Sequence, residues 1–165
     1  MGNVLIRAAK RSDYEALAQL QLDSWQTSYN RFLPARYLHD QAPLDLMDQW
    51  RNMRLKADDF ILVAFRDDHT GPAGFLSVRC RPAPFIDNLH CATAIRSRGT
   101  GQALMQAAFD RLRSRNKTSA SLSVLVGNDA AKRFYLRLGA TPGRVCREVI
   151  GDYPVDTEYM HWANF

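Results

Sequence analysis

Cysteine is scarce in this sequence, which has three cysteines and four histidines in 165 residues. Cys80, Cys91 and Cys146 are odd in number and far apart, so they fit neither a disulfide framework nor the paired ligands of a zinc site. The histidines are equally dispersed along the chain. We therefore expect reduced thiols and no metal site.

Long apolar runs and targeting segments are also missing. No stretch approaches the length needed to span a membrane, and the N-terminus lacks the charged region, apolar core and cleavage site of a signal peptide. Myristoylation is not expected, because Ile6 stands where that motif needs Ser or Thr. No internal repeat or low-complexity linker divides the chain. We expect one domain over residues 1–165, in the cytoplasm and without a membrane partner.

The charge balance is basic, with a formal net charge of +5. A positive surface suits a polyanionic partner, which is either a nucleic acid or a nucleotide-containing cofactor. The 22 basic residues are interspersed with 17 acidic ones, and no basic run carries the interleaved aromatic residues of a nucleic-acid-binding motif. The sequence therefore favours a small anionic ligand and no nucleic acid.

Hydrophobic patterning predicts a chain of alternating strands and helices. The expected strands are residues 4–7, 60–65, 74–79, 86–92, 122–126, 143–150 and 157–162. The first expected helix starts at Ser12, with a capping box between Ser12 and Glu15. Three further helices are expected over residues 43–56, 101–115 and 128–139. The strand at 86–92, the helix at 101–115 and the strand at 122–126 form a βαβ unit, whose two strands should be parallel with a right-handed crossover.

A glycine-rich stretch with the order Arg96-Ser97-Arg98-Gly99-Thr100-Gly101 joins the first strand of that unit to its helix. Its two glycines let the backbone approach a ligand and leave N–H groups free at the helix start, and the arginines can bind phosphate. The dinucleotide fingerprint needs a third glycine where Leu104 stands, and the Gly-Lys-Ser/Thr ending of a Walker A loop is absent. The stretch therefore indicates a pyrophosphate-binding turn; a surface connection with arginines for solubility is the alternative.

A second motif follows about thirty residues later, with the order Asn128-x-x-Ala131-x-x-Phe134-Tyr135-x-x-x-Gly139. Together the two motifs closely resemble the GNAT superfamily of acyl-CoA-dependent N-acyltransferases, specifically over residues 85 to 140. The resemblance implies an α/β fold with a mixed, mostly antiparallel central sheet, a central parallel βαβ unit and helices on both faces. It also implies acetyl-CoA as cosubstrate and acetyl transfer to a primary amine by direct nucleophilic attack.

The resemblance implies where the cofactor binds. The pyrophosphate would meet the backbone N–H groups of residues 98–101, with Arg96 and Ser97 beside it. Cys91 would pair through its main chain with the pantetheine arm and offer its N–H to the developing oxyanion. The family often has Val at this strand position and Pro shortly after, where this chain has Cys91 and Thr93. Main-chain contacts should tolerate both changes.

Asn128 and Tyr135 carry the remaining implied roles. Asn128 can cap its helix, and the matching family residue also lies against pantetheine. The matching family Tyr protonates the departing thiolate, and a phenol with a pKa near 10 can do so at neutral pH. For Tyr135 the alternative is a packed aromatic at helical spacing with Ala131 and Leu138.

The sequence offers several candidates for a general base. Asp87 and His90 lie on one expected strand, and its two-residue period predicts opposite faces for them. Some family members place a base at the position of Asp87, whereas His90 has the better intrinsic pKa. We take Asp87 as the base, with His90, water, Glu158 and His161 as alternatives. Cys91 is not expected to act as a nucleophile, because the sequence shows no evident Cys-His-acid set.

The identity of the acceptor stays open at this point. It could be a free amino acid, a polyamine, an aminoglycoside-like amine, or a protein N-terminus or lysine, although the basic surface favours one that is not strongly cationic. A non-catalytic CoA-binding regulatory module is the alternative to an enzyme. We expect four aromatic side chains near the end of the first helix to pack in the core and not to line an acceptor pocket: Trp25, Tyr29, Phe32 and Tyr37. A homodimer through the C-terminal strands is possible, with Tyr153, Tyr159 and Trp162 either at that contact or in the core.

Overall fold

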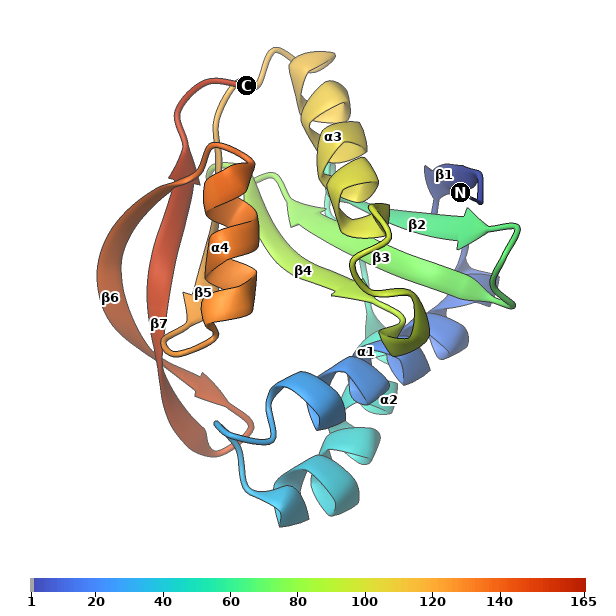
Figure 1. The fold of residues 1–165 in the computed structure, drawn as a ribbon, viewed down its shortest axis with the longest axis vertical. Coiled ribbons are helices and arrows are strands. Elements are labelled where there is room, and N and C mark those ends of the chain that lie inside the picture. Colours follow the sequence, from blue (N-terminus) through green and yellow to red (C-terminus); the bar gives the residue numbers. More distant parts are fainter. Residues whose placement is uncertain (1) are drawn as a thin grey trace.

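The computed structural model describes residues 2–165, and within them seven strands form one sheet in the order β1-β2-β3-β4-β5-β7-β6 (Figure 1). The strands are β1 Val4–Ala8, β2 Phe60–Arg66, β3 Pro72–Arg79, β4 Phe85–Cys91, β5 Ala120–Leu125, β6 Thr141–Ile150 and β7 Tyr153–Trp162. Neighbouring strands are antiparallel except β4 and β5, which are parallel. The predicted mixed, mostly antiparallel sheet with a central parallel pair is confirmed.

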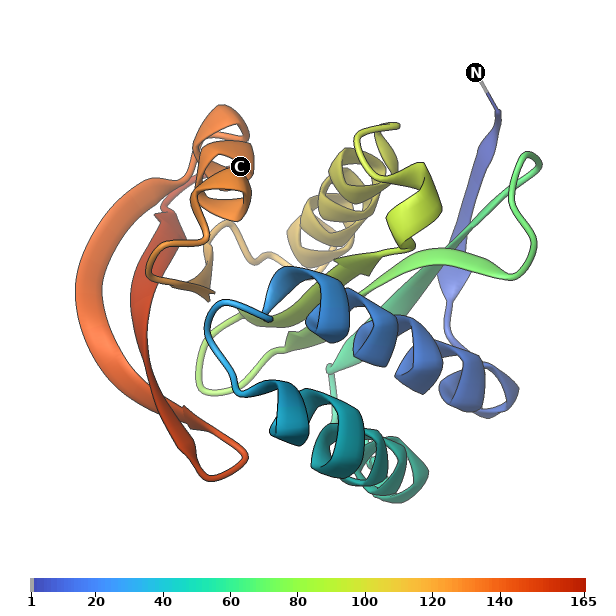
Figure 2. The same ribbon diagram turned by 60° about the horizontal axis from the view of Figure 1, so that its bottom comes forward.

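Helices cover both faces of the sheet, as predicted (Figure 2). They are α1 Tyr14–Ser28, α2 Ala42–Asn52, α3 Thr100–Arg113 and α4 Asp129–Arg137, with short helical turns at Arg11–Asp13, Tyr37–Gln41 and Thr93–Ile95. The α1 and α2 helices pack on one face of β2 and β3 through a cluster that includes Leu17, Trp50 and Phe75. The α3 and α4 helices pack on the other face, around Leu104 and Leu122. No helix within residues 2–165 combines the length and the apolar character needed to cross a membrane.

The parallel strands β4 and β5 meet at one end and then separate. Among the described residues their ladder contains one Cα pair, Phe85 with Ser121, beside a backbone bond from Ser121 N to the carbonyl oxygen of Pro84. Beyond this point β5 follows β7 and β6, while β4 stays with β3, so the sheet opens between residues 86–91 and β5 (Figure 1). The backbone edge of β4 is thus left without a strand partner along the rest of its length.

The first helix does not begin with the predicted capping box. Asp13, and not Ser12 with Glu15, takes the capping role: its carboxylate accepts a bond from Lys10 N at 2.6 Å and an ion pair from Arg7 at 2.7 Å. The hydrogen bond from Arg7 lowers the pKa of Asp13. A charge-assisted pair is stronger than a hydroxyl contact, so this carboxylate stabilises the short turn Arg11–Asp13, after which α1 begins at Tyr14.

The C-terminal strand begins earlier than predicted. The predicted strand covers residues 157–162, but β7 starts at Tyr153, and Pro154 pairs with Val149 of β6. A proline is tolerated there because β5 extends only to the partner of Thr157, so β7 has a neighbour on one side at Pro154. At its other end Trp162 is 2% exposed, so this aromatic side chain belongs to the core.

A chain of buried polar side chains ties α2 to β4. Trp50 Nε1 donates to Gln21 Oε1 at 2.7 Å, and Gln21 Nε2 donates to Asn88 Oδ1 at 3.1 Å. The amide of Asn88 then donates to Ser77 Oγ at 3.0 Å. Buried polar groups of this kind stabilise a fold when each has its partner. Gln21 therefore links the helical layer to the strand that borders the opening in the sheet.

Replacing Gln21 with leucine should destabilise the protein by about 1–3 kcal/mol, because Trp50 Nε1 and Asn88 Oδ1 would be left buried without this partner. The matched control is Gln19→Leu, since Gln19 lies on the same helix but is exposed and bonds Asp23 at the surface. Urea unfolding of both variants measures the difference. Equal stability of the two variants would contradict the role assigned to Gln21.

Candidate active site

A cleft of about 1130 Å³ lies where β4 and β5 separate. Its walls come from β4, β5, the C-terminal end of α1, the connection from β4 to α3, and α4. The cleft brings together most of the predicted site residues: Asp87, Cys91, Arg96, Ser97, Gly99, Thr100, Gly101, Asn128 and Tyr135. Arg98 lies outside this lining.

The start of α3 presents free backbone donors to the cleft. Gly99 adopts a positive φ of 82°, and the first helical backbone bond runs from Ala103 N to the carbonyl oxygen of Gly99 at 3.0 Å. The N–H groups of residues 100–102 therefore precede the hydrogen-bonded part of the helix and are available to an anion. A Cβ on Gly101 would lie 3.3 Å from the ring of Phe134, so a side chain at this position would crowd the approach of a ligand.

The side chain of Thr100 adds an unsatisfied donor at the same point. Thr100 is 2% exposed, and within the described part of the chain its hydroxyl has no hydrogen-bond partner. A buried hydroxyl without a partner is costly, about 1–3 kcal/mol, and the cost disappears when a ligand oxygen accepts its proton. The hydroxyl and the free N–H groups together fit a phosphate-containing group.

Both arginines of the glycine-rich stretch have protein partners. Arg98 pairs with Asp68 at 3.4 Å, and its carbonyl oxygen accepts a bond from Arg66 Nη1 at 3.1 Å. The hydrogen bond from Arg66 lowers the pKa of Asp68 to about 2, so this carboxylate stays ionised. The loop is therefore fastened to the β2–β3 turn. Arg96 instead reaches α1, where Nη2 donates to Ser24 Oγ at 3.1 Å.

The main chain of Cys91 is directed toward the opening in the sheet. Ala92 N donates to the carbonyl oxygen of Ala73 at 2.9 Å, so the next pair, Gly74 with Cys91, is a non-hydrogen-bonded pair of the antiparallel ladder. The N–H and carbonyl of Cys91 consequently point away from β3, to the side where β5 has separated. Burial raises the pKa of the Cys91 thiol to about 11, against the opposing effect of Arg96. A thiol held protonated is a poor nucleophile.

Tyr135 lies in the cleft from the α4 side. Its ring contacts those of Phe134 and Trp162 edge-on, at centroid distances of 5.2 and 6.0 Å. Burial raises the pKa of Tyr135, and the neighbouring Tyr29 and Cys91 raise it further. The phenol therefore keeps its proton at neutral pH.

Tyr29 is a cleft residue that the sequence analysis did not place in the site. It was assigned mainly to core packing, yet it lines the cleft beside Trp25, with ring centroids 5.7 Å apart. Burial raises the pKa of Tyr29 to about 12, and Arg96 opposes this shift. The accumulation of aromatic residues at the end of α1 was the available signal.

Asn128 takes the capping role predicted from the sequence. It is the N-cap of α4, and its side-chain oxygen accepts a bond from Ala131 N at 3.4 Å. Asn128 also lines the cleft, about two helical turns before Tyr135. The cap therefore fixes the start of the helix that carries Tyr135.

The predicted opposite orientation of Asp87 and His90 is wrong, because β4 contains a bulge. Val78 pairs with Ile86 but Ser77 pairs with Asn88, so Asp87 is an extra residue in the ladder and the two-residue period is interrupted. The Asp87 carboxylate accepts bonds from Arg79 Nη2 at 3.1 Å and Nε at 3.4 Å.

Both side chains accordingly lie on the α1 side of the sheet. Arg79, the partner of Asp87, shares a face of β3 with Phe75, whose ring lies 5.5 Å from that of His90. The extra residue therefore turns Asp87 to the same side as His90. A carboxylate has more acceptor sites than the two that Arg79 uses, so Asp87 can still bind an ammonium or a water molecule.

His90 is buried against α1 with its ring oriented by a hydroxyl. Nδ1 lies 2.9 Å from Ser24 Oγ, and the same oxygen accepts the bond from Arg96. Ser24 Oγ has no other acceptor for its proton among the described residues, so the arrangement that satisfies all three groups has Ser24 donating to Nδ1 and the ring proton of neutral His90 on Nε2. Burial and, to a smaller extent, the charge of Arg96 lower the pKa of His90 to about 3. With its lone pair engaged, His90 is a poor candidate for the base.

Glu158 and His161 lie away from the cleft lining. Glu158 pairs with Lys132 of α4 at 2.8 Å, and His161 is exposed. Within residues 2–165 no group of three or more His, Cys, Asp or Glu side chains is arranged to hold a metal ion.

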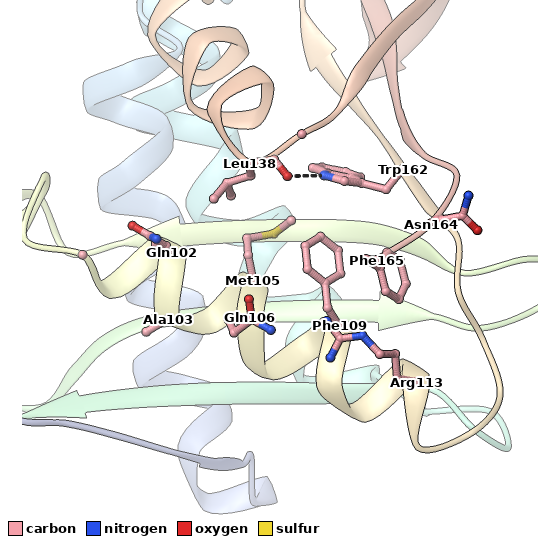
Figure 3. Close-up of a pocket in the computed structure, with 12 residues that line it drawn as sticks. Gln102, Ala103, Met105, Gln106, Phe109, Arg113, Leu138, Trp162, Asn164 and Phe165 are labelled. Atoms are coloured by element: carbon pink, nitrogen blue, oxygen red, sulfur yellow. Dashed lines mark hydrogen bonds between the residues drawn. The ribbon is translucent and has the colours of Figure 1, made fainter.

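A second hollow of about 530 Å³ lies between α3 and α4 and meets the first at the start of α3 (Figure 3). Gly99 and Gln102 line both. Trp162 Nε1 closes one wall by donating to the carbonyl oxygen of Leu138 at 3.0 Å, and Phe165 packs beside Phe109 with ring centroids 4.4 Å apart (Figure 3). A ligand held at the α3 N-terminus can therefore extend into either hollow.

Comparison with known proteins gives a consistent result. Residues 14–140 match the model of the acetyltransferase (GNAT) family. A Bacillus subtilis (strain 168) protein described as the uncharacterized N-acetyltransferase YuaI is 26% identical over 128 residues, which cover 76% of this chain and 73% of that protein.

Two solved structures share the fold over nearly the whole chain. A protein from Rhodopseudomonas palustris, described as a GCN5-related N-acetyltransferase (Aminotransferase, Class-II), superposes with a TM-score of 0.77 at 16% identity, over 98% of this chain and 96% of that one. The PaiA N-acetyltransferase of Thermoplasma acidophilum, solved in complex with coenzyme A, gives a TM-score of 0.70 at 17% identity, over 94% of this chain and 98% of that one.

The buried His90 should make the protein sensitive to acid. Unfolded histidine binds a proton below pH about 6.5, whereas folded His90 binds one only near pH 3, so the unfolded state holds more protons between these values. The free energy of unfolding should therefore fall as the pH falls through this window, by about 1 kcal/mol per pH unit.

The measurement is urea unfolding at pH 7, 6 and 5 for the native chain, His90→Asn and the control His161→Asn, whose histidine is exposed. Asparagine at position 90 keeps an acceptor for Ser24 and removes the titration. The native chain and the control should lose stability more steeply than His90→Asn. Parallel losses in all three proteins would contradict the assignment.

Proposed function

The chain belongs to the GNAT family of acetyltransferases, and we propose that it transfers an acetyl group from acetyl-CoA to a primary amine by direct attack of the amine. The observation that carries the proposal is one cleft with phosphate-binding donors at the start of α3 and a protonated phenol, Tyr135, across from Cys91. The related PaiA protein binds coenzyme A, which supports the choice of cosubstrate.

The nucleotide end of the cosubstrate would be held by the start of α3. The N–H groups of residues 98–101 and of Gln102, and the unpaired hydroxyl of Thr100, supply donors for phosphate oxygens. Ser97 stands beside them in the cleft lining, and Asn128 would lie along the pantetheine arm. Acetyl-CoA supplies an activated thioester as the acetyl donor. The N–H of Cys91, directed into the opening between β4 and β5, would stabilise negative charge on the acyl oxygen.

Tyr135 would donate the proton that the departing sulfur needs. Its O–H is protonated at neutral pH because burial raises its pKa, so the phenol is in the form that an acid requires. Phe134 and Trp162 fix the ring by edge-on contact.

Asp87 would accept the proton from the acceptor ammonium, directly or through water. The bulge in β4 turns its carboxylate to the α1 side of the cleft, and Arg79 fixes its orientation. The neutral His90 has its Nδ1 lone pair occupied by Ser24, which favours Asp87 over His90.

Replacing Tyr135 with phenylalanine should lower kcat by about 10²- to 10⁴-fold, the usual contribution of a general acid, and leave CoA binding unchanged. Thiol release over a mixed amine panel measures kcat, and calorimetry measures CoA binding. The matched control is Tyr14→Phe, because Tyr14 packs on Trp50 at the start of α1, away from the cleft. An unchanged kcat in Tyr135→Phe would remove this tyrosine from the mechanism.

Replacing Asp87 with asparagine should lower kcat/KM at neutral pH, and the loss should shrink as the pH rises toward the pKa of the acceptor amine. A free amine needs no base, so high pH replaces the lost carboxylate. The comparison is with Asp23→Asn, an exposed carboxylate on α1. A loss that is independent of pH would show that Asp87 has another role.

These experiments also decide between an enzyme and a CoA-binding regulatory module. The regulatory alternative draws support from the ion pair of Asp87 with Arg79, which occupies part of the candidate base. Tight CoA binding without thiol release for any amine would favour that alternative. Failure to bind CoA would contradict the role assigned to the start of α3.

A further inference from the structure

Arg96 places an uncompensated positive charge in the cleft. The guanidinium is partly buried, and the ion pairs formed within residues 2–165 do not include it. Arg79, Arg66 and Arg98, by contrast, each pair with a carboxylate. A guanidinium taken out of water without a counter-ion is unfavourable unless hydrogen bonds or a ligand compensate it. The charge of Arg96 is therefore left available to a ligand.

A neutral pair of side chains holds this guanidinium in place. Ser24 Oγ accepts from Arg96 Nη2 at 3.1 Å and donates to His90 Nδ1 at 2.9 Å, so the hydroxyl is satisfied in both directions. Ser24 and His90 are 5% and 7% exposed, which leaves little freedom for the pair to rearrange. Aspartate at position 24 would have anchored the same arginine and cancelled its charge. Serine anchors it and preserves the charge.

The guanidinium lies on the α1 side of the cleft. Its partner Ser24 belongs to α1, and its charge acts on Tyr29, which directly follows α1, on His90, which faces α1, and on Cys91 at the opening in the sheet. The α3 helix, whose N-terminal donors fit phosphate, packs on the opposite face of the sheet. The side that holds Ser24 and His90 is also the side to which Asp87, the proposed base, is turned. Arg96 and Asp87 thus border the same half of the cleft.

We propose that the amine acceptor carries an anionic group, a carboxylate or a phosphate, and that Arg96, held by Ser24 and His90, binds it. The inference rests on the proposed acetyl transfer and adds the class of acceptor. Asp87 receives the ammonium end of the molecule and Arg96 its anionic end, so the acceptor is a small zwitterionic amine such as a free amino acid or a phosphorylated amino alcohol. Ser24 is a positioning residue in this scheme, because it acts through Arg96.

The first experiment compares acceptors that carry an anionic group with partners that lack it. Thiol release is measured with free L-amino acids against their L-amino acid amides, and with O-phosphoethanolamine against ethanolamine. The native enzyme should prefer the anionic member of at least one kind of pair by about 10- to 100-fold in kcat/KM, as expected for one charge-assisted contact. The kind of pair that shows the preference tells carboxylate from phosphate.

The second experiment changes the charge beside Arg96 at constant side-chain size. Ser24→Asn keeps an acceptor for Arg96 and a donor for His90, whereas Ser24→Asp neutralises the guanidinium. Ser24→Asp should raise KM for the anionic acceptor by about tenfold or more and so remove most of the preference over the neutral amine. Ser24→Asn should keep the preference. Thermal melting of both variants shows that they fold, and Thr27→Ala, an exposed hydroxyl on the same helix, is the unrelated control.

The outcomes separate this inference from the proposed function. An enzyme that acetylates neutral amines as well as anionic ones, or a Ser24→Asp variant that keeps the preference, would overturn the anionic acceptor and leave acetyl transfer intact. If Ser24→Asp instead weakens CoA binding in calorimetry and spares the acceptor preference, the anion on Arg96 is a phosphate of the cosubstrate and the inference is wrong. CoA binding without acetylation of any panel member would overturn both.

Discussion

The separation of β4 from β5 is the constraint on which the rest of the structure depends. Two parallel strands that share one backbone pair leave the edge of β4 unsatisfied, and unsatisfied backbone groups inside a protein require a partner. An extended acyl-pantetheine arm has amides that can serve as that partner. Everything else in the cleft is arranged around this opening: α3 begins beside it, α4 carries Tyr135 to it from one face, and α1 brings Tyr29 to it from the other.

The sequence was sufficient for the parts of the fold that depend on local patterns. A continuous apolar run located β2, and the glycine-rich stretch and the Asn128 motif located the starts of α3 and α4 to within a residue. These features are readable because their causes lie within one turn or one strand. The outer bounds of β6 and β7 were less accurate, since the early start of β7 at Tyr153 depends on where β5 ends.

Features with distant causes were not readable. The bulge at Asp87 exists because of the register between β3 and β4, and a strand read alone gives no sign of it. Ser24 and His90 are 66 residues apart, and Ser24 and Arg96 are 72 apart, so this contact follows from the packing of α1 against the sheet. In each case a residue distant in the sequence determined the arrangement, because the local pattern allowed more than one.

The bulge in β4 also limits how related sequences can diverge. Side chains alternate between the two faces of a strand, so a chain that kept every residue of β4 but lost the bulge would exchange the faces of the residues on one side of Asp87. If β3 kept its place, either Ile86 would leave the core beneath α3, or Leu89 and Cys91 would turn to α1 while His90 entered that core. A substitution along β4 changes one side chain, whereas loss of the bulge would move several side chains to the wrong face at once. The register of this strand is therefore more restricted than the identity of its single residues.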